Sequence, residues 1–297
     1  MKKILITGKN GQVGWELQRS LATFGHVVAT DAEDLDLADA DAIRNTLREV
    51  RPDIIINPAA YTAVDKAESD PDLAMAVNGV APGILAEEAK RLGALLVHYS
   101  TDYVYDGSKT SPYVEDDVPN PQSVYGRTKL AGDEAIRTTG CRHLILRTSW
   151  VYGVHGGNFV KTMLRLAKER EKLTIVSDQF GAPTWARDIA QATASALGNW
   201  QTKNWNDELC GLYHLTAAGR TNWHQYAVEV VRLAREHDAI LKDKQLDIKG
   251  IATHEYPLPA KRPANSILTN NKIRDAFGIA MPAWQDSLAE CIRLLYE

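Results

Sequence analysis

The sequence predicts an α/β fold built on a doubly wound parallel sheet, with a smaller lobe toward the C-terminus. The first half of the chain alternates short apolar runs with longer amphipathic segments. The apolar runs, such as Ile54-Ile55-Ile56, are continuous, which is typical of strands buried on both faces of a parallel sheet. A glycine-rich turn follows the first of these runs. Repeated strand–helix–strand units with right-handed crossovers produce a doubly wound, Rossmann-type sheet.

The expected elements follow one another in strand–helix order. In the first half we expect strands at 3–7, 26–30, 53–57, 95–99 and 143–147, and helices at 12–23, 40–50, 73–92 and 123–139. In the second half we expect helices at 158–171, 187–197, 223–237 and 284–296, and strands at 173–176 and 212–215. Residues 239–263 contain three prolines and few periodic apolar positions, which favours a loop-rich cover over a site. The pattern predicts a Rossmann domain in residues 1–150, to which later segments return, and a mainly substrate-binding lobe in 151–297.

Composition excludes several classes of protein. The formal net charge of -4 comes without any basic run, which argues against nucleic acid as a partner. The three cysteines are widely spaced and form no CxxC motif, which favours reduced thiols in the cytosol. The apolar part of the first eight residues is too short for a signal peptide, and no stretch approaches the roughly 20 apolar residues of a membrane span. We therefore expect a cytoplasmic protein with no membrane partner.

The glycine-rich turn has the spacing Gly8-x-x-Gly11-x-x-Gly14 between the first strand and the first helix. Glycines at these positions allow a tight turn, close backbone approach to a pyrophosphate, and close packing of helix on strand. The helix N-terminus then presents free N–H groups and a positive dipole end to the phosphates. Because the strand–turn–helix context is correct, dinucleotide binding is favoured over a purely structural turn.

Asp31 ends the second strand, where an acidic side chain can bind the adenosine ribose 2′-OH and favour NADH. A solvated loop carboxylate is an equally good interpretation, because Glu33, Asp34 and Asp36 cluster nearby. Lys9 could meet a 2′-phosphate instead, so the sequence leaves open the choice between NADH and NADPH.

Tyr125 and Lys129 are spaced to lie on one face of a helix. A tyrosine with its usual pKa of about 10 is a poor acid, and a neighbouring ammonium is expected to lower that pKa. The pair could then protonate a developing alkoxide as hydride arrives. Thr101 follows the fourth strand, at the sheet edge where ligands bind in such folds, and could orient a substrate carbonyl. A strand-end cap is the structural alternative for Thr101, but the three signals together predict an oxidoreductase.

Several motifs carry a wider likeness. The short ones are the glycine turn, Asn57-x-Ala59-Ala60-Tyr61-Thr62, Ser100-Thr101-Asp102 and Tyr125-x-x-x-Lys129. The longer ones are residues 63–68, 147–152 and 178–184, with further matches at 211–214 and 262–263. Together they resemble the extended short-chain dehydrogenase/reductases, and within them the dTDP-4-dehydrorhamnose reductases, nearly from end to end.

The resemblance implies reduction of the 4-keto group of dTDP-4-dehydro-β-L-rhamnose by NADPH or NADH, the last step toward dTDP-L-rhamnose, a precursor of bacterial lipopolysaccharide O-antigen. It assigns Tyr125 as proton donor, Lys129 to the nicotinamide ribose and Thr101 to the substrate carbonyl. The remaining cofactor contacts that it implies are Gly8, Gly11, Gln12, Val13, Gly14, Asp31, Asp36, Leu37, Ala60, Tyr61, Thr62 and Tyr99. It places Asp102 and Trp150 at the substrate and leaves Asn78 structural.

A nucleotide-sugar substrate also gives a reason for the second lobe. Its diphosphate needs cations, and Arg262 in the proline-rich segment can offer a bidentate fork. Trp150, Trp185 and Trp223 could stack on the base or sugar, although packing within or between the lobes is at least as good an interpretation of Trp185 and Trp223.

Some members of the resembled family form a magnesium-bridged dimer through clustered carboxylates. Glu16 is retained here, but Arg187 and Leu295 stand where its acidic partners are expected. Since Mg²⁺ requires oxygen ligands, we predict no metal site, and a monomer or weak homodimer.

Two other functions remain open at this stage. One is a different nucleotide-sugar reductase or epimerase of the extended superfamily, such as an epimerase-reductase or an enzyme that forms the other C4 epimer. The other is a non-catalytic, cofactor-binding regulatory subunit, which the retention of Tyr125, Lys129 and Thr101 disfavours.

Overall fold

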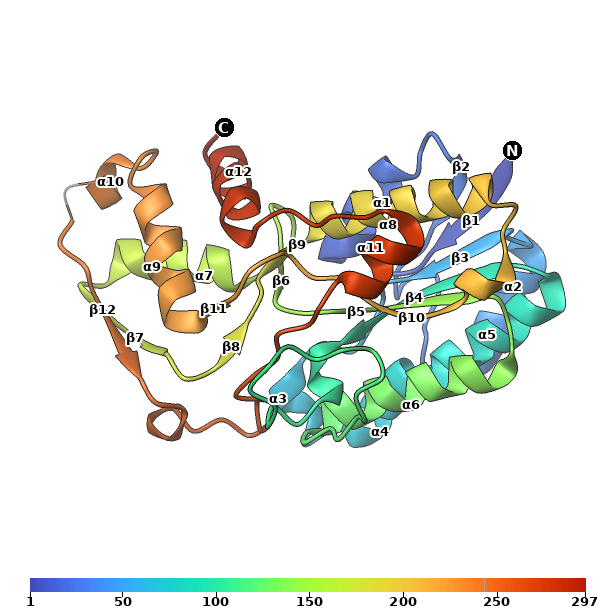
Figure 1. Cartoon of the computed structure of the whole chain (residues 1–297), viewed down its shortest axis with the longest axis horizontal. Coiled ribbons are helices and arrows are strands. Elements are labelled where there is room, and N and C mark those ends of the chain that lie inside the picture. Colours follow the sequence, from blue (N-terminus) through green and yellow to red (C-terminus); the bar gives the residue numbers. More distant parts are fainter. Residues whose placement is uncertain (243) are drawn as a thin grey trace.

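The larger lobe is built on a six-stranded parallel sheet in the computed structural model, which describes residues 1–242 and 244–297 (Figure 1). The strand order is β10-β5-β4-β3-β1-β2. Because β1 pairs with β2 on one side and β3 on the other, the chain reverses its direction of travel at β1. This arrangement confirms the predicted Rossmann-type sheet. The strands are β1 (Lys2–Ile6), β2 (Gly25–Ala29), β3 (Ile54–Asn57), β4 (Leu95–Thr101), β5 (His143–Thr148) and β10 (Gly211–His214).

Helices cover both faces of this sheet (Figure 1). One face carries α1 (Gln12–Ser20), α8 (Ala186–Thr202) and α11 (Asn271–Phe277), and the other carries α2 (Ala40–Val50), α5 (Ala81–Leu92) and α6 (Val124–Thr139). Alternate residues of each strand point into opposite cores, so that Ile54 and Ile56 belong to one and Ile55 to the other. Three elements of this lobe, α8, β10 and α11, come from beyond residue 150.

The helix expected at 73–92 is interrupted by a π-helical turn. The structure divides it into α4 (Pro71–Met75), the π turn η1 (Ala76–Val80) and α5, preceded by the short α3 (Val64–Ala67). Pro82 has no N–H to donate to the carbonyl of Asn78, which favours a wider turn at this point. A Cβ on Gly132 would lie 2.2 Å from that carbonyl, so α6 needs glycine there to approach the turn.

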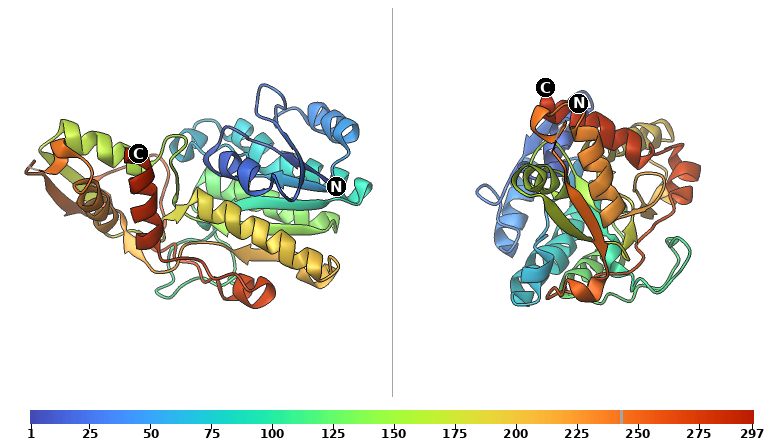
Figure 2. Two further views of the ribbon diagram at one scale, coloured as in Figure 1. Left: turned by 90° about the horizontal axis from the view of Figure 1, so that it is seen from above. Right: turned by 90° about the vertical axis from the view of Figure 1, so that its left-hand side faces the viewer.

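The smaller lobe packs α9 (Trp223–Ala234) against α7 (Phe159–Glu169) and α12 (Trp284–Tyr296), at the far end from the sheet (Figures 1 and 2). The expectation that residues 239–263 are loop-rich is partly wrong: they contain α10 (Ala239–Lys242) and β12 (Asp247–Ile251). β12 pairs in parallel with β7 (Lys172–Val176). The paired residues, such as Asp247 and Lys172, are 75 positions apart in the sequence. The other short strand pairs are β6 (Val151–Tyr152) with β9 (Thr184–Trp185), and β8 (Phe180–Gly181) with β11 (Thr221–Asn222).

The described chain also contains three short 3-10 turns, and the first of them directly follows β4. They are η2 (Asp102–Val104), η3 (Asp207–Leu209) and η4 (Thr253–Glu255). The short α11 was not expected from the sequence, and α8 runs five residues further than predicted. Among the described residues, no helix combines the length and the apolar character needed to span a membrane.

Candidate active site

The helix α6 begins next to the end of β4, and this places its first turn at the sheet edge. Ser123 caps the helix, because its hydroxyl accepts a hydrogen bond from the Gly126 N–H at 3.1 Å. A Cβ on Gly126 would lie 2.3 Å from the Tyr103 carbonyl, so glycine allows α6 to press against η2. This close contact brings Tyr125 next to Thr101 at the last position of β4.

Lys129 is 1% exposed, and its ammonium is held by β4. Its Nζ donates to the Tyr99 carbonyl at 2.7 Å and lies 3.1 Å from His98 Nε2. Burial lowers the pKa of Lys129 to about 8, and the nearby Asp133 carboxylate opposes that fall. Lys129 therefore carries most of its charge at neutral pH and loses it in mildly alkaline solution.

Tyr125 lies at the wall of a cavity and contacts the Tyr103 ring edge-on, with centroids 5.5 Å apart. Burial raises the pKa of Tyr125 to about 12, and the Thr101 hydroxyl opposes the rise. The expectation that an adjacent ammonium lowers this pKa is wrong for this structure. The Lys129 ammonium is directed to His98 and Tyr99 rather than to the phenol, so burial dominates.

Thr101 and Asp102 lie beside Tyr125 at the end of β4, and neither lines the sheet-edge cavity. The Thr101 hydroxyl donates to Asp102 Oδ1 at 3.0 Å and accepts from the Tyr103 N–H at 3.2 Å. Asp102 is 2% exposed, and its Oδ2 has no hydrogen-bond partner among the described residues. Burial raises the pKa of Asp102 to about 6.

The glycine turn has the close contacts that its spacing predicts. Gly8 has a φ of 62°, in the left-handed region that favours glycine. A Cβ on Gly14 would lie only 2.0 Å from the Gly8 carbonyl oxygen, so no larger residue fits there. Gly11 precedes α1 without a side-chain cap, which leaves the helix N-terminus open to an anion.

The sheet-edge cavity, of about 540 Å³, joins this turn to Tyr125. It lies outside the carboxyl ends of β1, β2, β3 and β4, where the strand order reverses, as ligand sites in open α/β sheets do. Of the residues predicted to bind a cofactor, those lining it are Gly8, Gly11, Gln12, Val13, Gly14, Asp31, Asp36, Leu37, Ala60, Thr62, Tyr99, Tyr125 and Lys129.

Tyr61 is directed elsewhere. Its hydroxyl donates to Asp70 Oδ2 at 3.2 Å, and its backbone N–H and C=O bond the side chain of Asn78 at 2.9 and 3.0 Å. Asn78, in the π turn, thus fixes the loop after β3, in agreement with its structural interpretation.

Asp31 anchors the glycine turn through its carboxylate. It accepts the N–H of Asn10 and that of Ala32, both at 2.8 Å. Beside it, Lys9 Nζ pairs with Asp34 Oδ2 at 2.5 Å, which raises the pKa of Lys9 and lowers that of Asp34. Both interpretations of Asp31 therefore stay open: it supports the turn and also lines the sheet-edge cavity.

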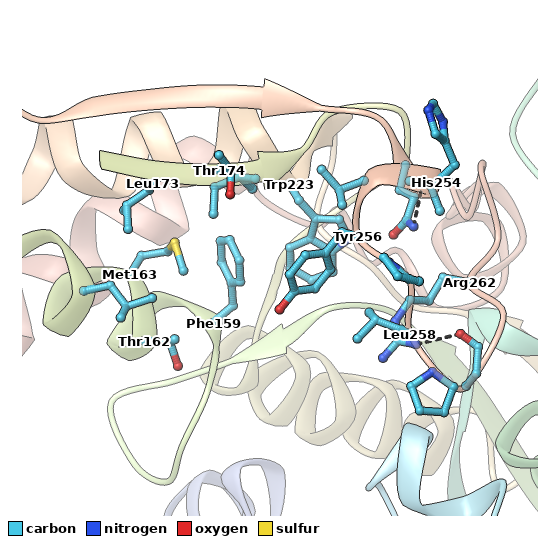
Figure 3. Close-up of a pocket in the computed structure, with 18 of the residues that line it drawn as sticks. Phe159, Thr162, Met163, Leu173, Thr174, Trp223, His254, Tyr256, Leu258 and Arg262 are labelled. Carbon is cyan, nitrogen blue, oxygen red and sulfur yellow. Dashed lines mark hydrogen bonds between the residues drawn. The ribbon is translucent and has the colours of Figure 1, made fainter. Parts of the chain in front are cut away.

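A second, larger cavity, the lobe cavity of about 880 Å³, lies between α7, β7 and the proline-rich segment (Figure 3). Its wall is mainly apolar, and Phe159, Trp223 and Tyr256 project into it (Figure 3). Sequence reasoning missed Phe159 and Tyr256. Phe159 lies on the apolar face of an amphipathic helix, a position that indicates a core residue. Tyr256 belongs to no motif or periodicity that indicates a binding residue.

Arg262 lies at the end of the lobe cavity nearest the larger lobe. Its guanidinium forms a bidentate pair with Asp65 of α3, at 2.8 and 2.7 Å. The Ala260 N–H also donates to Asp65, at 3.1 Å. Asp65 therefore ties the proline-rich segment to the sheet lobe, and this pairing holds the pKa of Asp65 below its usual value.

The three tryptophans named from the sequence have different environments. Trp150 stacks on Trp223 with ring centroids 3.6 Å apart, and its φ of 48° lies in the left-handed region. Gly181 packs against the Trp150 indole, where a Cβ would come within 2.6 Å. Trp185 is 4% exposed within the core of the smaller lobe, which favours packing over substrate contact for this residue.

Glu16 is 5% exposed and forms ion pairs within the chain. Its carboxylate lies 2.8 Å from Arg19 and 3.5 Å from Arg187. The described residues contain no group of three or more His, Cys, Asp or Glu side chains arranged to hold a metal.

Comparison with known proteins gives a consistent result over the whole length. A family model described as the RmlD substrate binding domain matches residues 1–297. A dTDP-4-dehydrorhamnose reductase of Burkholderia thailandensis is 49% identical over 292 residues, 98% of each chain. The structure of a dTDP-4-dehydrorhamnose reductase from Clostridium acetobutylicum is similar with a TM-score of 0.90 and 40% identity, covering 99% of this chain and all of that one. Another, from Bacillus anthracis and in complex with NADP, has a TM-score of 0.89 and 34% identity over 99% of each chain.

Proposed function

The chain belongs to the RmlD substrate binding domain family, and from that premise we propose that it is a dTDP-4-dehydrorhamnose reductase. It reduces the 4-keto group of dTDP-4-dehydro-β-L-rhamnose to give dTDP-L-rhamnose, the last step in the synthesis of that nucleotide sugar. The observation that carries the proposal is the sheet-edge cavity, which joins the glycine turn to Tyr125 and Lys129 in a chain that matches such reductases from end to end.

The residues of the sheet-edge cavity fit a reduced nicotinamide dinucleotide. Gly14 leaves room that any Cβ would fill, and the start of α1 offers N–H groups to a pyrophosphate. When bound, the cofactor supplies the hydride that adds to the carbonyl carbon. Lys129 holds the nicotinamide ribose with an ammonium that is already fixed by β4. Preformed donors of this kind need no reorganisation when charge develops.

Tyr125 donates the proton that completes the reduction. The carbonyl oxygen gains negative charge as its carbon accepts hydride, and the phenolic O–H protonates that oxygen to give the alcohol. Tyr125 is protonated at neutral pH, and because burial raises its pKa to about 12, the proton moves only as negative charge develops on the carbonyl oxygen. Thr101, next to it, orients the carbonyl oxygen by a hydrogen bond, and we assign Asp102, which accepts a hydrogen bond from Thr101, to the substrate as well.

The lobe cavity accommodates the thymidine end of the substrate. Phe159, Trp223 and Tyr256 present aromatic surfaces for the base (Figure 3). The Trp150 ring stacks on that of Trp223. Arg262 borders the cavity on the side of the sheet lobe, where a diphosphate that joins base and sugar would run. Its bidentate geometry, shown here with Asp65, suits a phosphate equally well.

Both NADPH and NADH serve as cofactor in this proposal. Asp31 lines the cavity beside the expected position of the adenosine ribose, with Asp36 and Leu37 beside the adenine. Lys9, in the glycine turn, is the cation that we assign to a 2′-phosphate; its exposed pair with Asp34 contributes little stability and could be given up for the phosphate.

We propose no magnesium site, because the Arg187 guanidinium lies close to the Glu16 carboxylate and neutralises its charge. A cation at this position opposes a second cation, and the described residues contain no cluster of acidic side chains that would supply oxygen ligands for Mg²⁺. Equilibrium dialysis should show no stoichiometric binding of Mg²⁺; tight binding of one ion per chain or per dimer would contradict this inference. We also propose a cytoplasmic location, which is consistent with the buried free thiols of Cys141 and Cys291. Without a magnesium bridge, we expect a monomer or a weak homodimer.

The deciding experiment couples the protein to the dehydratase and epimerase that make its substrate, and follows the oxidation of reduced nicotinamide. The expected product is dTDP-L-rhamnose, identified by the configuration at C4 in its NMR spectrum. Formation of the other C4 epimer would point to a different reductase of the superfamily, and the absence of any sugar product would refute the proposal. Omission of the epimerase is the matched control for substrate identity.

A further inference from the structure

A chain of buried polar side chains lies behind Lys129, on the side away from the cavity entrance. His98 on β4 is 1% exposed, and its Nε2 faces Lys129 Nζ at 3.1 Å. On the other side of the ring, Nδ1 lies 3.0 Å from the amide of Asn57 on β3. It is the Asn57 Nδ2 that faces this ring nitrogen, while the Asn57 Oδ1 accepts a hydrogen bond from the Thr7 hydroxyl, next to β1, at 2.6 Å. Side chains from or next to three neighbouring strands, β4, β3 and β1, thus form one hydrogen-bonded series that ends at the Lys129 ammonium.

The protonation state of each group follows from counting donors and acceptors. Burial and the charge of Lys129 hold the pKa of His98 well below its usual value, so the ring is neutral, with one N–H and one lone pair. Because the Lys129 ammonium can only donate, Nε2 must accept and Nδ1 must carry the proton. This tautomer requires the Asn57 amide to be turned by 180° from the orientation given above, so that its oxygen accepts from Nδ1–H and its nitrogen donates to the Thr7 hydroxyl.

We infer that His98 is a positioning residue for Lys129, whose ammonium it holds through the Nε2 lone pair while Asn57 and Thr7 hold the ring. The bonds to His98 and to the Tyr99 carbonyl use two of the three N–H donors of Lys129. They fix the direction of the third, which is left for the nicotinamide ribose. This inference rests on the proposed function, since it assigns the ribose as the partner of Lys129.

Other groups around Lys129 do not replace this contact. On α6, Tyr125 lies one helical turn before Lys129, and Asp133 lies one turn after it. Asp133 is committed to Arg147 of β5, whose guanidinium lies 3.0 Å from it, and to the Ser100 hydroxyl at 2.9 Å. Asp133 therefore favours the charge of Lys129 from a distance, whereas His98 and the Tyr99 carbonyl set the direction of its N–H bonds.

The test compares His98→Leu, which removes the acceptor at similar volume, with His98→Gln, whose amide oxygen can accept. Without the acceptor, the ammonium loses a charge-assisted hydrogen bond, so kcat should fall by about 10- to 100-fold. The alkaline limb of the pH profile of kcat, which reports deprotonation of Lys129, should move to lower pH by about one unit. His98→Gln should return both values most of the way to wild type.

A matched control is His214→Leu, which removes another fully buried histidine. His214 Nε2 bonds the Tyr105 hydroxyl at 2.9 Å, outside the cavity. This variant should lose stability but keep the alkaline limb in place. If His98→Leu lowers kcat without moving that limb, or if His98→Gln is no better than His98→Leu, His98 is only a packing residue and the inference fails.

A second measurement needs neither substrate nor a stable variant. Nitrogen-15 labelling of the histidines gives the tautomer of each ring by NMR. The signals of His98 are those missing from the spectrum of His98→Gln. If that variant does not fold, they are the signals of a neutral ring that shift between pH 7 and pH 9 as Lys129 titrates. The Nδ1–H tautomer is expected at pH 7, and the Nε2–H tautomer would overturn the inference. A wild-type protein that shows no turnover would count against the proposed function, whereas the tautomer bears on His98 alone.

Discussion

Replacement of Lys129 by methionine keeps the length of the side chain and removes its charge from a site that is 1% exposed. The folded protein holds the pKa of this lysine at about 8, against an ordinary value of 10.5. At pH values below 8 the lysine is charged in both the folded and the unfolded state, and the buried ammonium destabilises the folded state. The difference between the two pKa values corresponds to about 3 kcal/mol. The variant is relieved of that cost.

The variant also loses two hydrogen bonds, to the Tyr99 carbonyl and to His98 Nε2, and leaves both acceptors buried. An unsatisfied buried acceptor costs about 1–3 kcal/mol. At pH 7 the two effects offset each other, so the free energies of unfolding of the variant and the wild type should differ by no more than about 2 kcal/mol. Turnover, in contrast, should be nearly abolished.

The pH dependence isolates the charge. Because the folded pKa of this base is lowered, the unfolded chain binds the proton more tightly between pH 8 and 10.5, and stability rises with pH in that window. The free energy of unfolding of the wild type minus that of Lys129→Met should therefore increase by about 2 kcal/mol between pH 7 and pH 10. Urea denaturation at both pH values measures it, and titration of the other groups cancels in the difference. A difference that stays flat across this range would refute the account of Lys129 as a charge held in the protein interior.

Three further variants test the site. Tyr125→Phe keeps the ring but removes the acid, so kcat should fall by about 10²- to 10⁴-fold in the coupled assay, with little change in the cofactor dissociation constant measured by fluorescence titration. Gly14→Ala places a methyl group 2.0 Å from the Gly8 carbonyl oxygen. Cofactor affinity should therefore fall at least about tenfold, and the melting temperature should drop. Unchanged cofactor binding would show that the turn can relax. Arg262→Gln removes the bidentate fork, so KM for the nucleotide sugar should rise by about 10- to 100-fold while kcat changes little, and Asp65→Asn, which loosens the same segment but keeps the arginine, should raise KM less.

The elements that the sequence predicted well are those with a local signal. The first five strands and the helices between them follow from runs and periodicities within about 15 residues, because burial on one or both faces constrains neighbouring positions. β12 and α11 were missed, since the pairing of β12 with β7 and the packing of α11 on α8 are supplied by distant segments. The glycine turn was predicted because its spacing alone encodes its geometry.

The sequence by itself therefore determined the sheet, the glycine turn and the placement of Tyr125 and Lys129 on one helix face, all of which depend on spacing along the chain. The tertiary structure alone decided what each of these side chains meets. It turned Lys129 toward His98 and the Tyr99 carbonyl, so that burial raises the pKa of Tyr125 instead of the ammonium lowering it. It also paired Arg262 with Asp65 and directed Tyr61 away from the cavity. The strength of a charge depends on its distance and on the solvent around it, and both are set by chain segments that no local pattern brings together.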